Sequence, residues 1–136
     1  MGDIKSGLYI AGAGIKVQSE RLRVIAENIA NSETTASKPG GTPYQRKTIH
    51  FKNELDKELG VNVVKVDKIG LDRSPFLKVY NPGHPAADAE GYVLKPNVDP
   101  VVESADLKEA QRTYEANLGV IEVTKSMLNR TLDLLR

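Results

Sequence analysis

The most informative stretch of the sequence is IKSGLYIAGAGIKVQSERLRVIAENI, which runs from Ile4 to Ile29. Its apolar residues recur every seven positions, with a second series interleaved between them. Such a heptad pattern places one narrow stripe along a single helix of about 40 Å. A narrow stripe is typical of a seam between helices rather than of a helix packed on a sheet. The stripe consists of Ile4, Leu8, Ala11, Ile15, Leu22, Ile25 and Ile29.

Three glycines weaken this first helix. Gly7, Gly12 and Gly14 each cost about 1 kcal/mol relative to alanine in a helix interior. We therefore expect the segment to be largely unfolded until a partner covers its stripe. The Gly12-Ala13-Gly14 triplet is not a dinucleotide loop, because Val17 stands where the third glycine would be and no strand precedes it. Small residues at these positions instead allow another helix to approach closely.

A second helix is predicted to begin at Pro100. Asp99 precedes it as an N-cap residue, and proline is well suited to the first helical position. If continuous, this helix is about 54 Å long, more than the small middle region of the chain can cover. We therefore expect some other surface to cover it. Its stripe consists of Leu107, Tyr114, Leu118, Ile121, Leu128, Leu132 and Leu135, and Ala110, Val120, Val123, Met127 and Leu134 widen the apolar surface.

Between the two helices the pattern changes twice. Residues 32–43 form a polar linker or surface loop rich in glycine and proline. Residues 44–98 form a small β-rich module, with strand candidates at 47–51, 61–66 and 76–80 separated by turn signals.

The fold class predicted from these patterns is α+β. The N-terminal assembly helix lies within residues 1–31 and the C-terminal assembly helix within residues 99–136. The two helices pair in a coiled-coil-like inner layer, with the β-rich module between them in sequence. A pairing of the two helices only within one chain remains an alternative. The unequal helix lengths and the glycines of the first helix favour contacts between chains.

Composition argues against several classes of function. The chain has 19 Lys and Arg against 18 Asp and Glu, so no charge excess points to nucleic acid or to an anionic membrane. It has no cysteine, which excludes disulfides and thiolate metal sites. His50 and His84 are far apart and have no metal-ligand partner at the usual spacing. The carboxylates Glu103, Asp106, Glu109 and Glu115 are interpreted as a solvated helix face.

We therefore expect no catalytic residues, no metal, no cofactor and no small-molecule substrate. No serine lies in a G-x-S-x-G motif, and an enzyme would need a polar pocket for which the sequence offers no motif. No apolar run reaches the roughly 18 residues of a membrane span. The N-terminus also lacks a basic region followed by an apolar core, so we expect no cleaved signal peptide.

Two stretches resemble a known family. RVIAENIANSETT at residues 23–35, followed by YQRK at 44–47, is similar to the N-terminal signature of bacterial flagellar axial proteins. YNPGHPAAD at residues 80–88 and RTYEAN at 112–117 resemble basal-body rod proteins of the FlgC type within that family. Residues 36–43 depart from the general axial pattern in a way that is itself similar to the FlgC type.

The resemblance implies a structural subunit of the proximal rod. Such a subunit polymerises through its terminal helices into the torque-transmitting tube around the export channel, with the β-rich module facing outward. The implied partners are other rod proteins, copies of the chain itself, the flagellar type III export apparatus and basal-body adaptor or ring proteins. The implied location is the rod in the periplasm, reached without a cleaved signal peptide. An adaptor that forms one discrete coiled-coil complex remains the alternative.

Overall fold

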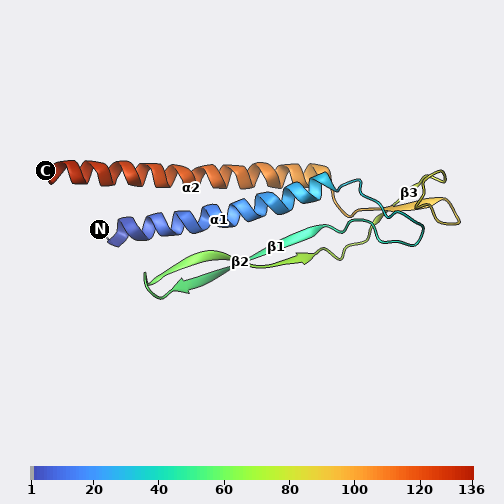
Figure 1. The fold of residues 1–136 in the computed structure, drawn as a ribbon, viewed down its shortest axis with the longest axis horizontal. Helices are drawn as coiled ribbons and strands as arrows, with labels where there is room; N and C mark the ends of the chain where they lie inside the picture. The colour runs from blue at the N-terminus through green and yellow to red at the C-terminus, as the bar shows by residue number, and fades with distance from the viewer. Residues whose placement is uncertain (1) are drawn as a thin grey trace. The chain divides into compact units, whose positions relative to one another are not determined.

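The computed structural model in Figure 1 describes residues 2–136 and confirms the α+β class. Two long helices, α1 (Gly2–Ala30) and α2 (Pro100–Leu134), come first and last in the chain. Four strands lie between them in sequence and form two separate two-stranded sheets. The strands are β1 (Lys47–Asp56), β2 (Val61–Leu71), β3 (Leu77–Tyr80) and β4 (Tyr92–Lys95).

The described residues divide into two compact units. The first unit contains residues 2–22, 50–68 and 108–136. The second contains Arg23–Ile49 and Ile69–Leu107. Each long helix therefore contributes its residues to both units, and each sheet lies mainly in one of them.

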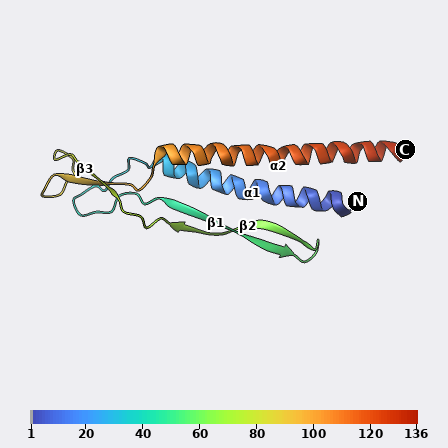
Figure 2. The ribbon, with the colours of Figure 1, turned by 180° about the vertical axis from the view of Figure 1, so that it is seen from behind.

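In the first unit α1 and α2 run side by side in opposite directions, as Figures 1 and 2 show from two sides. Arg21 meets Glu109 at 3.5 Å between Nη2 and Oε2. Seven residues earlier in α1, a Cβ added to Gly14 would lie only 2.7 Å from Nδ2 of Asn117. The expectation that small residues allow a close helix approach is confirmed at Gly14. The fully buried apolar residues of this unit are few and small, namely Ala11, Val17, Val63 and Ala110.

The β1–β2 hairpin of the first unit closes with a well-satisfied turn. Oδ1 of Asp56 accepts hydrogen bonds from the backbone N–H groups of Glu58 and Leu59, at 3.0 and 3.1 Å. Gly60 has φ of +67°, a conformation that costs glycine least, and its N–H donates to the Asp56 carbonyl at 2.7 Å. Tyr9 of α1 donates its hydroxyl hydrogen bond to the same Asp56 carboxylate. The turn is thereby tied to α1.

The second sheet is shorter and only half covered. β3 and β4 are antiparallel, with Val79 opposite Val93 and Tyr80 opposite Tyr92. Val93 is buried, whereas the two tyrosines are exposed on the other face and meet edge to face at 5.4 Å between centroids. Alternation along each strand therefore gives this sheet one inner and one outer face.

The structure both confirms and extends the strand predictions. The three predicted strands are present, and β1 and β2 each continue five residues beyond the predicted ends at 51 and 66. β4 was not predicted, because its four residues lie between glycine and proline and only its pairing with β3 identifies it. The single module expected at 44–98 contains two sheets that fall mainly in different compact units.

The loop at residues 32–43 is closed by its own hydrogen bonds. The backbone N–H of Tyr44 donates to the carbonyl of Thr34 at 3.0 Å. His84 also reaches this loop: its Nδ1 accepts from the Ala86 N–H at 3.0 Å, which leaves Nε2 to donate to Oγ1 of Thr35 at 3.3 Å. His84 therefore has a structural role in holding this loop.

Candidate assembly interface

A buried asparagine anchors the end of α1 in the second unit. The side chain of Asn28 is 1% exposed and pairs with the backbone of Lys47 like an extra strand residue. Its Nδ2 donates to the Lys47 carbonyl at 2.9 Å, and its Oδ1 accepts from the Lys47 N–H at 2.9 Å. The same Oδ1 accepts a third bond from the Tyr44 hydroxyl at 2.8 Å. Asn28 thus fixes the start of β1 against the helix.

Charged side chains reinforce this junction on its exposed side. Nζ of Lys47 lies 2.8 Å from Oε2 of Glu27, and Arg23 lies 3.0 Å from the other carboxylate oxygen. The hydrogen bond from Lys47 is the largest influence on the pKa of Glu27, and together with the charges of Lys47 and Arg23 it lowers this pKa despite the opposing effect of burial. The Glu27 carboxylate therefore remains charged and bridges the two cations.

A second buried polar cluster ties the start of α2 to the β region. The Arg46 guanidinium forms a short contact with Glu103, which is 1% exposed, and an ion pair with Asp72 at 3.3 Å. The Arg46 N–H donates to Oδ1 of Asn97 at 2.8 Å, and Nδ2 of Asn97 donates to the Asp72 carbonyl at 2.9 Å. Arg46 and Asn97 therefore connect the first turn of α2, through Glu103, with the segment around Asp72 that follows β2.

The electrostatics of the cluster favour charged side chains. Burial opposes the charge of Arg46, but the hydrogen bonds and charges of Glu103 and Asp72 outweigh it and raise the pKa of Arg46. The pKa of Asp72 is lowered, first by the hydrogen bond from the Ser74 N–H and further by Arg46. The cluster is therefore an ionic lock at neutral pH.

The interpretation of Glu103 as part of a solvated face was wrong. Glu103 lies in the first turn of α2, and its 1% exposure reflects the contact with Arg46. Asp99 caps the same turn as predicted, since its Oδ1 accepts from the Val101 N–H at 3.0 Å. Helical spacing alone cannot distinguish a solvated acid from one that meets a partner 57 residues earlier in the chain.

The predicted stripe residues mostly face inward within one chain. Arg21 faces Glu109 and Gly14 faces Asn117, so the two helices share an antiparallel seam. Pairing within one chain, the alternative from the sequence, therefore describes part of the structure. Eleven of the fourteen predicted stripe residues are buried or half-buried: Ile4, Leu8, Ala11, Ile15, Leu22, Ile25, Ile29, Leu107, Tyr114, Ile121 and Leu128.

The other three predicted residues are exposed. Leu118 lies beside the seam, Leu132 lies in the last turn of α2, and Leu135 directly follows the helix. Continuing the seam from Gly14 and Asn117 places Gly2 opposite a residue close to 129. The end of α2 therefore extends past the start of α1, which explains why Leu135 is 77% exposed.

A second set of exposed apolar residues follows α2 on a different face. At 100° per residue this face lies about 120° around the helix from the seam. Its exposed fractions reach 60% at Val123 and 87% at Leu134. We call this set the outer stripe, and it consists of Val120, Val123, Met127 and Leu134. The sequence predicted these residues only as an extension of the apolar surface of the second helix, not as a separate face.

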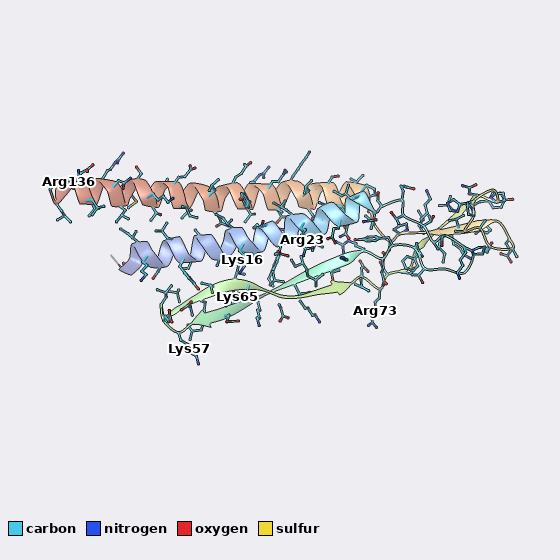
Figure 3. The ribbon with its side chains drawn as sticks, viewed as in Figure 1. Lys16, Arg23, Lys57, Lys65, Arg73 and Arg136 are labelled. Atoms are coloured by element: carbon cyan, nitrogen blue, oxygen red, sulfur yellow. The ribbon has the colours of Figure 1, made fainter. Side chains whose placement is uncertain are left out.

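The first unit also has an apolar groove between α1 and β2, with a volume of about 660 Å³. Its floor on α1 includes Gly12 and Ala13, and a Cβ added to Gly12 would meet nothing within 4 Å. Figure 3 labels Lys16 on α1 and Lys65 on β2, which belong to the groove's polar lining. The remaining lining residues are Leu8, Tyr9, Val17, Glu20, Val63, Val64 and Val66.

Many of the large apolar side chains that are exposed belong to α2, among them Val101, Val102, Val123 and Leu134.

Within residues 2–136, no helix combines the length and the apolar character needed to cross a bilayer. Within the same residues, no group of three or more histidines and carboxylates is arranged to hold a metal ion.

Comparison with known proteins identifies the family. The C-terminal family of the flagellar basal body rod FlgEFG proteins matches residues 89–134. The flagellar basal-body rod protein FlgC of Agrobacterium fabrum is 49% identical over 136 residues, which is all of this chain and 98% of that protein. FlgC of Salmonella typhimurium is 41% identical over 92% of both chains, and FlgC of Bacillus subtilis is 38% identical over 93% of this chain and 95% of its own. The chain therefore belongs to the FlgC family of flagellar basal-body rod proteins, and it is a structural subunit of the rod.

Proposed function

We propose that the chain polymerises through its terminal helices into the torque-transmitting tube of the proximal rod, around the export channel. The observation that carries this proposal is the outer stripe on α2, which no residue of the chain covers among those described. Burial of a Val, Met or Leu side chain contributes about 1.5–3 kcal/mol. Each subunit added to the rod would therefore be stabilised by the burial of these side chains against its neighbour.

The seam and the outer stripe have different roles in assembly. The half-buried seam, from Ile4 to Ile29 on α1 and from Leu107 to Leu128 on α2, aligns the two helices within a chain. The exposed residues, which are Leu118, Leu132, Leu135 and the outer stripe, meet neighbouring subunits. The neighbours are copies of the chain, other rod proteins, and basal-body adaptor or ring proteins at the end of the rod.

The role is mechanical rather than catalytic, and the chain reaches the rod through the flagellar type III apparatus without a cleaved signal peptide. Passage through a narrow channel requires an easily unfolded chain. The few small residues of the first unit's core and the glycines of α1 support this requirement. The terminal helices then gain their full stability only when neighbours cover them.

The test uses one exposed substitution and a matched control in the same part of α2. Val123→Asp places a charge in the outer stripe, whereas Asn129→Asp places the same charge on an exposed face outside it. We expect Val123→Asp to be absent from purified basal bodies and to abolish motility, while Asn129→Asp is incorporated normally. Leu22→Asp and Ile121→Asp are also expected to prevent incorporation, because they break the seam. Normal rods containing Val123→Asp would contradict the proposal.

A further inference from the structure

The groove between α1 and β2 is a space that the chain itself does not fill. It is an open surface groove of about 660 Å³, and it lies beside a core of four small residues. The small residues at Gly12 and Ala13 leave its floor open, and a Cβ added at Gly12 would meet nothing within 4 Å. The groove is therefore shaped to receive side chains from outside.

We propose that the groove of one copy receives the outer stripe of α2 from a second copy. This inference rests on the proposed polymerisation and names one contact that would produce it. The lengths agree: the groove follows α1 from Leu8 to Glu20, about 18 Å, and the stripe runs from Val120 to Leu134, about 21 Å. Met127, at the middle of the stripe, has the flexible side chain that best fills an irregular apolar space.

Symmetry determines the direction in which the second copy enters. Copies related by rotation and translation along one axis keep the same polarity. If the helices follow that axis, α2 of the neighbour runs antiparallel to α1, as the chain's own α2 does. Leu134 of the neighbour then lies at the Tyr9 end of the groove, Met127 lies near Gly12, and Val120 lies at the Glu20 end.

Two carboxylates of the β1–β2 turn, which act on Tyr9, favour this direction. At the Tyr9 end, Asp56 accepts the Tyr9 hydroxyl, and Glu58 acts on the same hydroxyl electrostatically. Lys65, the nearby cation, is already paired with Glu54 at 3.0 Å. Arg130 flanks the C-terminal half of the outer stripe and forms no ion pair within residues 2–136. The antiparallel direction brings Arg130 toward Asp56 and Glu58, which act on Tyr9 but do not line the groove. Glu20, the acidic residue of the lining, lies at the opposite end.

The contact joins two different surfaces, so it does not close on itself. A groove that is filled by one neighbour leaves the stripe of the same copy free to enter another groove. Such a heterologous contact repeats without limit and produces an open array rather than a dimer. This property distinguishes it from a symmetric pairing of two α2 helices, which would stop at two copies.

Cysteine cross-linking tests the contact directly, because the natural chain has no cysteine. Two variants of the full chain that differ in tag length, one with Gly12→Cys and one with Met127→Cys, are expressed together and basal bodies are purified under mild oxidation. We expect a mixed disulfide dimer of the two variants, and no such product when Asn129→Cys replaces Met127→Cys. Basal bodies that contain both variants without the mixed disulfide would overturn the groove contact and leave the rod function intact. Absence of the wild-type chain from basal bodies would instead contradict the proposed function.

A second variant keeps the contact testable if the cysteine variants are not incorporated. Gly12→Leu fills the groove floor, and its added Cβ meets no atom of the same chain. We expect purified wild-type chain to self-associate with rising concentration in analytical ultracentrifugation. Gly12→Leu should raise the concentration needed at least tenfold while its helix content is unchanged. Equal self-association of the two proteins, or association that stops at a dimer, would refute the groove contact.

Discussion

Replacement of Asn28 by alanine gives the sharpest test of how α1 is held in the second unit. The substitution removes three hydrogen bonds of 2.8–2.9 Å and leaves the Lys47 N–H, the Lys47 carbonyl and the Tyr44 hydroxyl without their partner. A buried polar group that loses its partner costs about 1–3 kcal/mol. Lys47 and Tyr44 are half-buried, so water can reach them in part and the lower value applies.

The expected loss is therefore about 3 kcal/mol in the free energy of unfolding. With an unfolding entropy of about 2.1 cal/mol/K per residue, this corresponds to a decrease in Tm of about 10 °C. Thermal and urea unfolding followed by circular dichroism measure both quantities. Asn31→Ala is a suitable control, because Asn31 is half-buried and its side chain makes two local bonds: its Nδ2 donates to the Glu27 carbonyl at 2.9 Å, and its Oδ1 accepts from the exposed Thr34 hydroxyl at 3.0 Å.

A double-mutant cycle separates the hydrogen bonds from a general effect of the substitution. Tyr44→Phe removes the hydroxyl alone and should cost about 1 kcal/mol in the wild-type chain. In the Asn28→Ala background the same change should cost almost nothing, because its acceptor is already absent. A loss below 1 kcal/mol for Asn28→Ala, or an equal cost of Tyr44→Phe in both backgrounds, would refute the reasoning.

Three further predictions concern the helix seam, the ionic lock and the effect of pH. Gly12→Ala should raise the free energy of unfolding by up to about 1 kcal/mol. Gly14→Ala should raise it by less, or lower it, because the added Cβ would lie 2.7 Å from Asn117 Nδ2, and Asn117→Ala in the same chain should restore the stabilisation. Equal effects of the two glycine substitutions would contradict the close approach of the helices. Glu103→Ala should lower the free energy of unfolding by about 3 kcal/mol, since it leaves the partly buried Arg46 without its main partner. In urea unfolding, a loss no larger than that of Glu109→Ala, which removes an exposed acid, would contradict this prediction. Because the pKa of Asp72 is lowered in the folded chain, its carboxylate adds stability above the unfolded pKa of about 3.9, and this stability is lost as pH falls through the folded pKa. The Tm should therefore decrease as pH is lowered below about 4, and it should decrease less steeply in Asp72→Asn. Parallel plots of Tm against pH for the two proteins would contradict the ionic lock.

The helices were predictable because their signals are local. Asp99 and Pro100 mark the start of α2 by capping chemistry, and the heptads of both helices extend over most of their length. The strands at 47–51 and 61–66 were also recognised from β-branched and alternating residues. Their full extent depends on pairing between strands, which no local window contains.

The partners of Asn28 and of the ionic lock could not be derived from residue spacing. Asn28, Arg46 and Glu103 lie in three different segments, and each could have been a solvated residue on its own element. The family resemblance covered the stretches that contain Asn28 and Arg46, but it did not indicate which residues these two side chains contact. The outer stripe was similarly hidden, because helical periodicity shows that α2 has a broad apolar surface but not which part faces α1.

Chemical labelling of single cysteines tests most directly whether neighbours cover the outer stripe in the rod. Met127→Cys introduces the only thiol of the chain at an exposed position, and a maleimide reagent can report its accessibility in the free protein and in purified basal bodies. Coverage by a neighbouring subunit predicts rapid labelling of the free chain and labelling at least tenfold slower in basal bodies. Equal labelling rates in the two states would contradict assembly through the outer stripe.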